Sequence, residues 1–293
     1  PKSSFLKTSN FKNLKFKRYW NLKYKPNYNL NYKQIINKTK TLVKKAFQLR
    51  FRSDVPIGLC LSGGIDSGNI AAFSKKILKN NIKTYSIIDK DIRYNEVKNI
   101  NLLEKELKIK NYKIYLNKEN NLRRLEKLIK YKKQPLCTLS YYNHSLLLKK
   151  MKKDKIKVCL LGTAADEIFA GYYDHYLLHL SSCKNKDLFS LNKKYFEKFI
   201  KPFIRNPLLK NPYKYIKNPN DRRHVYDESD KLKNFLIKTK TFSFKEKPYS
   251  QDLMRKRMMN ELFHEATPVI LNEDDTNAMF HSIENRSPYL RLK

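Results

Sequence analysis

The chain has 293 residues, enough to bury one large core or two smaller ones. It contains no run of about 18 apolar residues, so we expect no helix that spans a membrane. Its formal net charge is +36, from 63 basic and 27 acidic residues. Because the excess is mostly Lys spread along the whole chain, we interpret it as solvated surface charge and expect no nucleic-acid partner.

The cysteines show no C-x-x-C pairing, and two of the four lie in apolar, strand-like runs: Cys60, Cys137, Cys159 and Cys183. We interpret all four as buried, reduced thiols rather than as disulfides or zinc ligands. The polar start of the chain lacks the apolar centre of a signal peptide. These features together predict a cytoplasmic protein.

Strands and helices are predicted to alternate after a polar first segment, which we interpret as a linker or edge segment. Apolar residues at helical spacing predict helices over Tyr32–Arg50, Gly68–Leu78, Val97–Leu107, Asn120–Tyr131 and Tyr141–Met151. Short apolar or alternating runs predict strands over Val55–Leu61, Lys83–Ile88, Asn111–Leu116 and Ile156–Leu161. This order predicts an α/β fold with a parallel sheet, helices on both faces and a mostly helical C-terminal part. Ligands of such sheets bind beyond the carboxyl ends of the strands.

The first motif, Ser62–Ser67 (SGGIDS), follows the first predicted strand. Adjacent glycines let the backbone approach an anionic ligand, and unpaired amides at the start of a helix favour negative charge. The loop contains no Lys, so it is not the common P-loop; its acid, Asp66, would sit beside a polyphosphate only with a divalent cation between them. We therefore predict Mg²⁺ and pyrophosphate there. The alternative is an ordinary strand-to-helix turn that Asp or Ser caps.

A second motif, Gly162–Tyr172 (GTAADEIFAGY), follows another predicted strand and has the same order of small residues and then acids. Two such loops at strand ends can face each other across one site. Asp66 and Asp166 would then hold the same Mg²⁺. Alternatively, the acids Asp166 and Glu167 only complement a helix dipole.

Three sequence blocks together resemble the synthetase domain of glutamine-hydrolysing asparagine synthetases. They are VPIGLCLSGGIDS at 55–67, GTAADEIFAGY at 162–172, and the segment from Glu273 through MFHSIENRSPYL at 279–290. The SGGIDS loop resembles the PP-loop of ATP pyrophosphatases, which implies an adenine nucleotide alpha hydrolase-like fold. The resemblance further implies that residues 1–30 are a linker after an absent N-terminal glutaminase domain. Residues 31–293 would be the synthetase domain, incomplete at its C-terminus.

The resemblance implies a two-step ligation with ATP and Mg²⁺ as cofactors. ATP adenylates the side-chain carboxylate of aspartate and releases pyrophosphate, and ammonia, supplied directly or from glutamine, then displaces AMP to form asparagine. The partners would be these small molecules and a glutaminase domain or subunit, with a homodimer left open. The implied ATP and pyrophosphate residues are Cys60, Ser62, Gly63, Gly64, Asp66, Ser67, Ile87, Leu161 and Gly162. The implied catalytic residues are Asp66, Asp166 and Thr163, with Asp66 and Asp166 as metal ligands.

Several residues depart from the family pattern. Gly68 replaces a second Ser of the PP-loop, Ala164 replaces a common Gly, and Thr163 stands where many members have an acid. No basic residue occupies the phosphate-neutralising position near Thr276. Arg286 would serve instead, or would form a buried structural ion pair with Glu284, which is our preferred interpretation.

These departures keep two alternatives open. One is an amidotransferase of the same superfamily that acts on a surface sugar or a secondary metabolite. The other is an inactive remnant that serves as a nucleotide-binding scaffold.

Overall fold

The computed structural model describes residues 4–7, 14–20, 24–91, 94–116, 121–226, 235 and 245–290. The chain divides into two compact units, Pro1–Asn37 and Lys38–Lys293. The first unit contains β1 (Ser4–Leu6) and β2 (Phe16–Arg18), which pair antiparallel with Ser4 opposite Arg18. The sequence predicted no strands there, because three-residue strands leave almost no alternation to detect. The division predicted between residues 30 and 31 stays a prediction.

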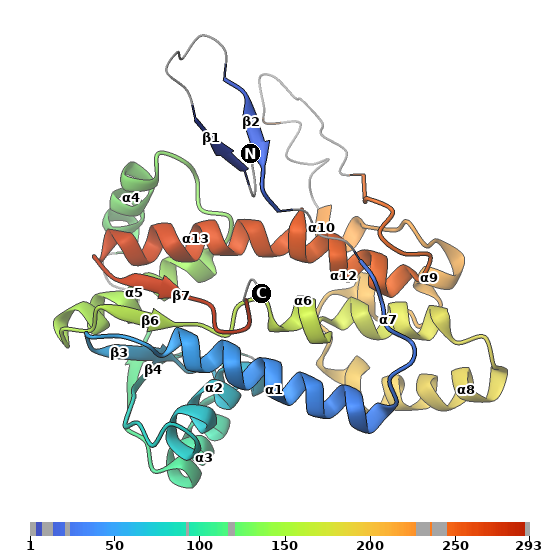
Figure 1. Cartoon of the computed structure of the whole chain (residues 1–293), viewed down its shortest axis with the longest axis horizontal. Helices are drawn as coiled ribbons and strands as arrows, with labels where there is room; N and C mark the ends of the chain where they lie inside the picture. The colour runs from blue at the N-terminus through green and yellow to red at the C-terminus, as the bar shows by residue number, and fades with distance from the viewer. Residues whose placement is uncertain are drawn as a thin grey trace. The chain divides into compact units, whose positions relative to one another are not determined.

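A five-stranded parallel sheet forms the centre of the second unit, in the order β5-β4-β3-β6-β7 (Figure 1). Its strands are β3 (Ile57–Cys60), β4 (Lys83–Ile88), β5 (Asn111–Tyr115), β6 (Val158–Leu160) and β7 (Glu284–Arg286). The predicted α/β fold class with a parallel sheet is confirmed. The sequence missed β7, whose residues ENR show no apolar pattern; pairing with β6 makes this segment a strand.

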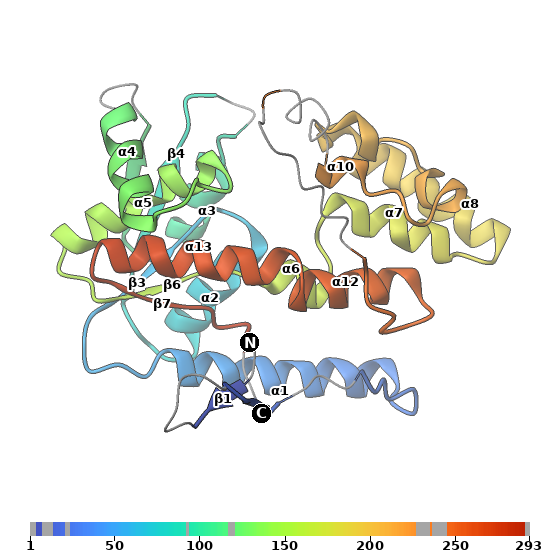
Figure 2. The same cartoon turned by 90° about the horizontal axis from the view of Figure 1, so that it is seen from above.

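Helices cover both faces of the sheet. On one face, α1 (Tyr32–Arg50), α2 (Ile65–Lys76) and α3 (Val97–Leu107) contribute Phe47, Ile70 and Ile100 to a core that includes Leu59 of β3. On the other face, α5 (Leu139–Lys153) and α13 (Ala266–Phe280) pack against residues of β4 and β6. Figures 1 and 2 both place α13 alongside α5. This arrangement leaves the carboxyl ends of the strands for a ligand.

The C-terminal part is mostly helical, as predicted. Helices α7 (Tyr173–Ser182), α8 (Lys186–Tyr195), α9 (Lys214–Lys217) and α10 (Arg223–Tyr226) lie together beside the sheet (Figure 2). Leucines of α7 share a core there with Phe196, Ile204 and Tyr215. Further helical segments within the described residues are α4 (Asn121–Lys132), α6 (Ala165–Phe169), α12 (Leu253–Phe263), a π-helical turn at Phe196–Ile200 and 3₁₀ turns at Lys201–Phe203 and Pro207–Leu209.

The four thiols are free, as predicted, but not all are buried. Cys159 is buried, Cys60 and Cys183 are partly exposed, and Cys137 is exposed. Cys137 precedes α5 instead of lying in a strand, so the sheet does not enclose it. Within the described ranges, no helix is long and apolar enough to cross a membrane.

Candidate active site

The first loop is held by its own hydroxyl groups. The Ser62 N–H donates to Ser67 Oγ at 3.1 Å, the two hydroxyls lie 3.0 Å apart, and the Gly64 N–H donates to Ser62 Oγ at 3.2 Å. Gly63 has φ +83°, and a Cβ at this position would lie 3.2 Å from the carbonyl oxygen of Glu96. The left-handed backbone and the close neighbour together favour glycine. The loop is therefore compact, and it turns the chain directly from β3 into α2.

The second loop leads from β6 into the short helix α6. Ala164 has φ +76°, a left-handed conformation that costs an L-residue roughly 1–2 kcal/mol. Asp166 is half-buried in the first turn of α6, and Gly171 lies against it; a Cβ on Gly171 would be 1.7 Å from Asp166 Oδ1. The absence of a side chain at Gly171 leaves room for the Asp166 carboxylate.

The two loops meet, as the sequence predicted. A Cβ placed on Gly162 would lie 3.1 Å from Cβ of Asp66. Burial and the charge of Glu167 raise the pKa of Asp66. Burial, followed by the charges of Asp66 and Glu167, raises the pKa of Asp166 to about 6. Two half-buried carboxylates that repel each other suit a divalent cation, which would relieve both effects.

A cavity of about 740 Å³ opens at this edge of the sheet. Its wall contains most of the predicted nucleotide residues and one of the two catalytic residues predicted in the second loop, Thr163. These lining residues are Cys60, Ser62, Asp66, Ser67, Ile87, Leu161, Gly162 and Thr163. Asp166 is outside its wall, next to Asp66. Gly63 and Gly64 line a second, more apolar groove of about 1030 Å³ between α1, α2 and α3, together with Asp66. The loop thus separates two hollows.

Glu284 and Arg286 line neither hollow. Arg286 Nε donates to Glu284 Oε1 at 2.7 Å, and its Nη1 donates to the carbonyls of Arg50 and Arg52 at 3.0 and 2.7 Å. The expected ion pair therefore forms, but it is not buried, because the Glu284 side chain is 59% exposed. The edge position of β7 explains this exposure, and the pair joins β7 to the end of α1.

Sequence reasoning missed the residues that α5 and α13 bring to the cavity. Asp274 of α13 accepts a hydrogen bond from Thr163 Oγ1 at 2.9 Å, and burial raises its pKa to about 6. His144 of α5 lies with Nε2 3.3 Å from Cys60 Sγ, and burial lowers the pKa of this imidazole to about 4. The acidic run at 273–275 was the available signal, but it does not show which acid points inward.

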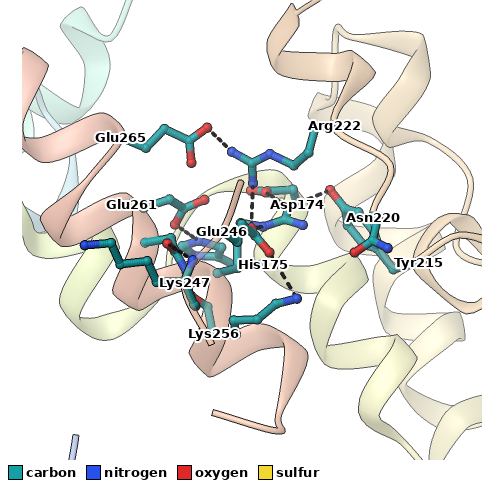
Figure 3. A network of polar contacts seen from close by, with 12 residues as sticks. Asp174, His175, Tyr215, Asn220, Arg222, Glu246, Lys247, Lys256, Glu261 and Glu265 are labelled. Carbon is teal, nitrogen blue, oxygen red and sulfur yellow. Dashed lines mark hydrogen bonds and ion pairs between the residues drawn. The ribbon is translucent and has the colours of Figure 1, made fainter. Parts of the chain in front are cut away.

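A buried polar network lies behind the second loop (Figure 3). His175 of α7 accepts the Gly171 N–H on Nδ1 at 3.2 Å, so Nε2 carries the proton and donates to Glu261 Oε2 at 2.8 Å. Asp174 lies 3.8 Å from the buried guanidinium of Arg257. Asp174, His175 and Glu261 have the spacing of metal ligands. Because both imidazole nitrogens are already occupied and a cation is adjacent, this cluster is a structural network.

Comparison with known proteins assigns the family. The asparagine synthase family model matches residues 38–293. The chain belongs to the asparagine synthase family. The resemblance that the three sequence blocks carry is thereby confirmed, and the matched residues coincide with the second compact unit.

Curated relatives agree with this family. The chain is 29% identical to asparagine synthetase [glutamine-hydrolyzing] 1 of Bacillus subtilis over 139 residues, which cover 47% of this chain and 22% of the relative. It is 29% identical to a putative asparagine synthetase [glutamine-hydrolyzing] 2 of Methanocaldococcus jannaschii over 143 residues, 48% of this chain and 27% of the relative. The match thus spans roughly a quarter of these relatives' length.

Among solved structures, the chain is similar to an NH3-dependent NAD synthetase from Campylobacter jejuni. The identity is 19% and the TM-score 0.33, over 70% of this chain and 93% of that chain. A U34-tRNA thiolase from Methanococcus maripaludis gives 14% identity and a TM-score of 0.35, over 87% of this chain and 82% of that chain. At these scores the similarity carries no argument about function.

Proposed function

We propose that the chain uses ATP to activate a carboxylic acid as an acyl-adenylate and then transfers the acyl group to nitrogen. The observation that carries this proposal is the meeting of the two strand-end loops, which brings Asp66, Ser67 and Gly162 into one cavity wall and Asp166 next to Asp66. Family membership supports the reaction class. The names of the relatives support aspartate as the acid, with asparagine as product through β-aspartyl-AMP.

The proposed chemistry proceeds in two displacements. A carboxylate oxygen attacks the α-phosphorus of ATP, and the bond from that phosphorus to pyrophosphate breaks. A nitrogen nucleophile then attacks the acyl carbon, the bond to AMP breaks, and the nitrogen loses a proton. Ammonia would come from solution or from a glutaminase domain or subunit acting on glutamine. That partner, a homodimer and a cytoplasmic location stay predictions.

The residues of the two loops fit a magnesium pyrophosphate. Asp66 and Asp166 would hold Mg²⁺, which when bound would stabilise negative charge on the departing pyrophosphate. The hydroxyls of Ser62 and Ser67 and the Gly64 amide lie within one compact turn and would orient its oxygens. Thr163 carries no charge, but its hydroxyl donates a hydrogen bond to Asp274. We therefore give Thr163 the role of positioning the Asp274 carboxylate.

The test is aspartate-dependent release of pyrophosphate from MgATP, in the presence of ammonium. We expect the wild-type chain to release pyrophosphate and Asp66→Ala to lose at least 100-fold in rate, because a metal ligand is removed. Asp275→Ala is the matched control, because this substitution removes the same charge from a residue that is exposed on α13. If the wild-type rate does not exceed that of Asp66→Ala, the proposed activity is wrong and the nucleotide-binding scaffold becomes the better explanation.

A different acid acceptor is the second candidate. One relative, amidase chyE of Penicillium rubens, is 24% identical over 153 residues, which cover 47% of this chain and 23% of the relative, and is not named as an asparagine synthetase. The uncharged Thr163, at a position where the family resemblance leads us to expect an acid, also favours an altered acceptor. The same assay with other carboxylic acids in place of aspartate separates the two candidates.

A further inference from the structure

Asp274 is a buried carboxylate in the cavity wall, and few neighbouring groups of the protein balance its negative charge. Its side chain is 5% exposed, and the residue contributes to the cavity wall. Thr163 Oγ1 donates to Oδ2 at 2.9 Å. Within the described ranges, its only ion-pair contact is His144, whose Nδ1 lies 3.8 Å from Oδ1, too far for a hydrogen bond. The neighbouring acid Glu273 adds negative charge instead of balancing it. Oδ1 is therefore free to accept a hydrogen bond from a ligand.

The preceding residue, Glu273, is a buried acid whose charge the protein itself balances. Glu273 is 1% exposed and forms an ion pair with Lys132, and Cys137 Sγ lies 3.3 Å from its second oxygen. For Asp274, no Lys or Arg lies within ion-pair distance among residues 24–91, 94–116, 121–226 and 245–290. His144 supplies no charge at neutral pH, because burial lowers its pKa to about 4. A buried carboxylate without a cation is costly, so a cationic ligand would stabilise it.

The location connects Asp274 to the proposed reaction. Its partner Thr163 follows Gly162, and Gly162 lies against Asp66. Asp274 therefore approaches the predicted pyrophosphate site from α13, across the second loop. A small molecule that places a cation on Asp274 can extend its other end toward the loop where ATP would be cleaved.

We propose that Asp274 binds the ammonium group of an amino acid substrate, and that Thr163 orients the Asp274 carboxylate for this contact. The inference rests on the proposed function and specifies its substrate class: a carboxylic acid that also carries an ammonium group. An ammonium supplies three N–H donors, which suits the unoccupied Oδ1. Thr163 acts as a positioning residue.

Binding, not turnover, tests this inference. Calorimetric titrations use the full chain saturated with Mg²⁺ and a non-hydrolysable ATP analogue. The probes are two pairs of acids, aspartate with succinate and glutamate with glutarate, and the members of each pair differ only in the ammonium group. We expect at least one amino acid to bind and its partner to bind at least tenfold more weakly.

Variants then locate the contact. Asp274→Asn should weaken amino acid binding at least tenfold and leave the affinity for the ATP analogue and for the acid without an ammonium unchanged. Thr163→Val should give an intermediate loss, and Asp275→Asn, on the exposed side of α13, should give none. Retained binding of the ATP analogue shows that each variant is folded.

Three results would overturn the inference: neither amino acid binds, the two members of a pair bind equally, or a folded Asp274→Asn binds the amino acid like the wild type. The first two results are obtained with the wild-type chain, so the proposal can be overturned even if the Asp274→Asn variant does not fold. Pyrophosphate release is measured separately. If amino acid binding depends on Asp274 while no pyrophosphate is released, the proposed function is wrong and the ammonium site remains.

Discussion

Two acids of the candidate site, Asp166 and Asp274, lie in surroundings that disfavour their charged form. Burial raises the pKa values of Asp166 and Asp274 to about 6, and neighbouring carboxylates add to the effect. In the native state these groups therefore take up protons more readily than in the unfolded chain. Active sites commonly keep such charges at the expense of stability, since they act on ligands rather than on the fold.

The residue Asp166 gives a prediction about pH. Because the pKa of Asp166 is raised from 3.8 to about 6 in the native state, this group contributes stability that is fully present below about pH 3.8. That contribution is lost as the pH rises through about 6. We expect Asp166→Asn to raise the free energy of unfolding at pH 7 by about 1 kcal/mol, after allowance for its partial exposure. The gain should vanish near pH 4. Urea unfolding in EDTA at both pH values measures it, with Asp275→Asn as control; a loss of stability at pH 7 would contradict the sign.

Ala164 gives a second prediction at this scale. Its φ of +76° lies in the left-handed region, where a Cβ is unfavourable. Ala164→Gly should therefore stabilise the protein by about 0.5–1 kcal/mol, despite the extra freedom of glycine in the unfolded chain. Thermal unfolding measures the difference. Ala165→Gly, at the first residue of α6 and without a positive φ, is the control and should destabilise.

At the scale of elements, one buried network joins α7 to α12. Arg257 of α12 pairs with Glu246 and lies 3.8 Å from Asp174 of α7, and His175 bonds Glu261. The side chain of Arg257 is 0% exposed. Because His175 also accepts the Gly171 N–H, the network supports the loop that carries Asp166.

Removing Arg257 should therefore damage the fold strongly. Arg257→Met leaves Glu246 and Asp174 without this cation, and we expect a loss of about 3–5 kcal/mol in the free energy of unfolding. The control Lys256→Met removes a charge that also pairs with Glu246 but lies on a side chain that is 23% exposed, and should cost less than about 1 kcal/mol. Chemical denaturation compares them; equal effects would show that the network contributes no special stability.

Element predictions succeeded where one apolar pattern dominated. The predicted spans Tyr32–Arg50, Lys83–Ile88 and Val97–Leu107 coincide with α1, β4 and α3. The β7 segment, which the sequence missed, has no such pattern. Strand β7 forms because β6 offers it unpaired backbone groups, which is information about a neighbour and not about the segment itself.

At the scale of the whole molecule, the net charge of +36 acts on the stability of the fold through long-range repulsion. Such an excess of one sign repels itself in the compact state, and salt screens this repulsion over about 10 Å at 0.1 M. We expect stability to rise by about 1 kcal/mol between 20 and 300 mM NaCl, which corresponds to about 2–4 °C in Tm. Scanning calorimetry measures the shift, and a fall in Tm with salt would mean that specific ion pairs outweigh the repulsion.

The sequence alone determined the family, the parallel α/β class and the two loops that meet at the site. These features depend on local order: apolar runs set the strands, and a glycine-rich or acidic turn after a strand must emerge at the carboxyl edge of the sheet. Only the tertiary structure decided that Asp274 joins the site and that Glu284 and Arg286 do not. The inward face of α13, and the pairing of β7 with β6, are set by contacts between segments more than 100 residues apart, and no local pattern encodes them.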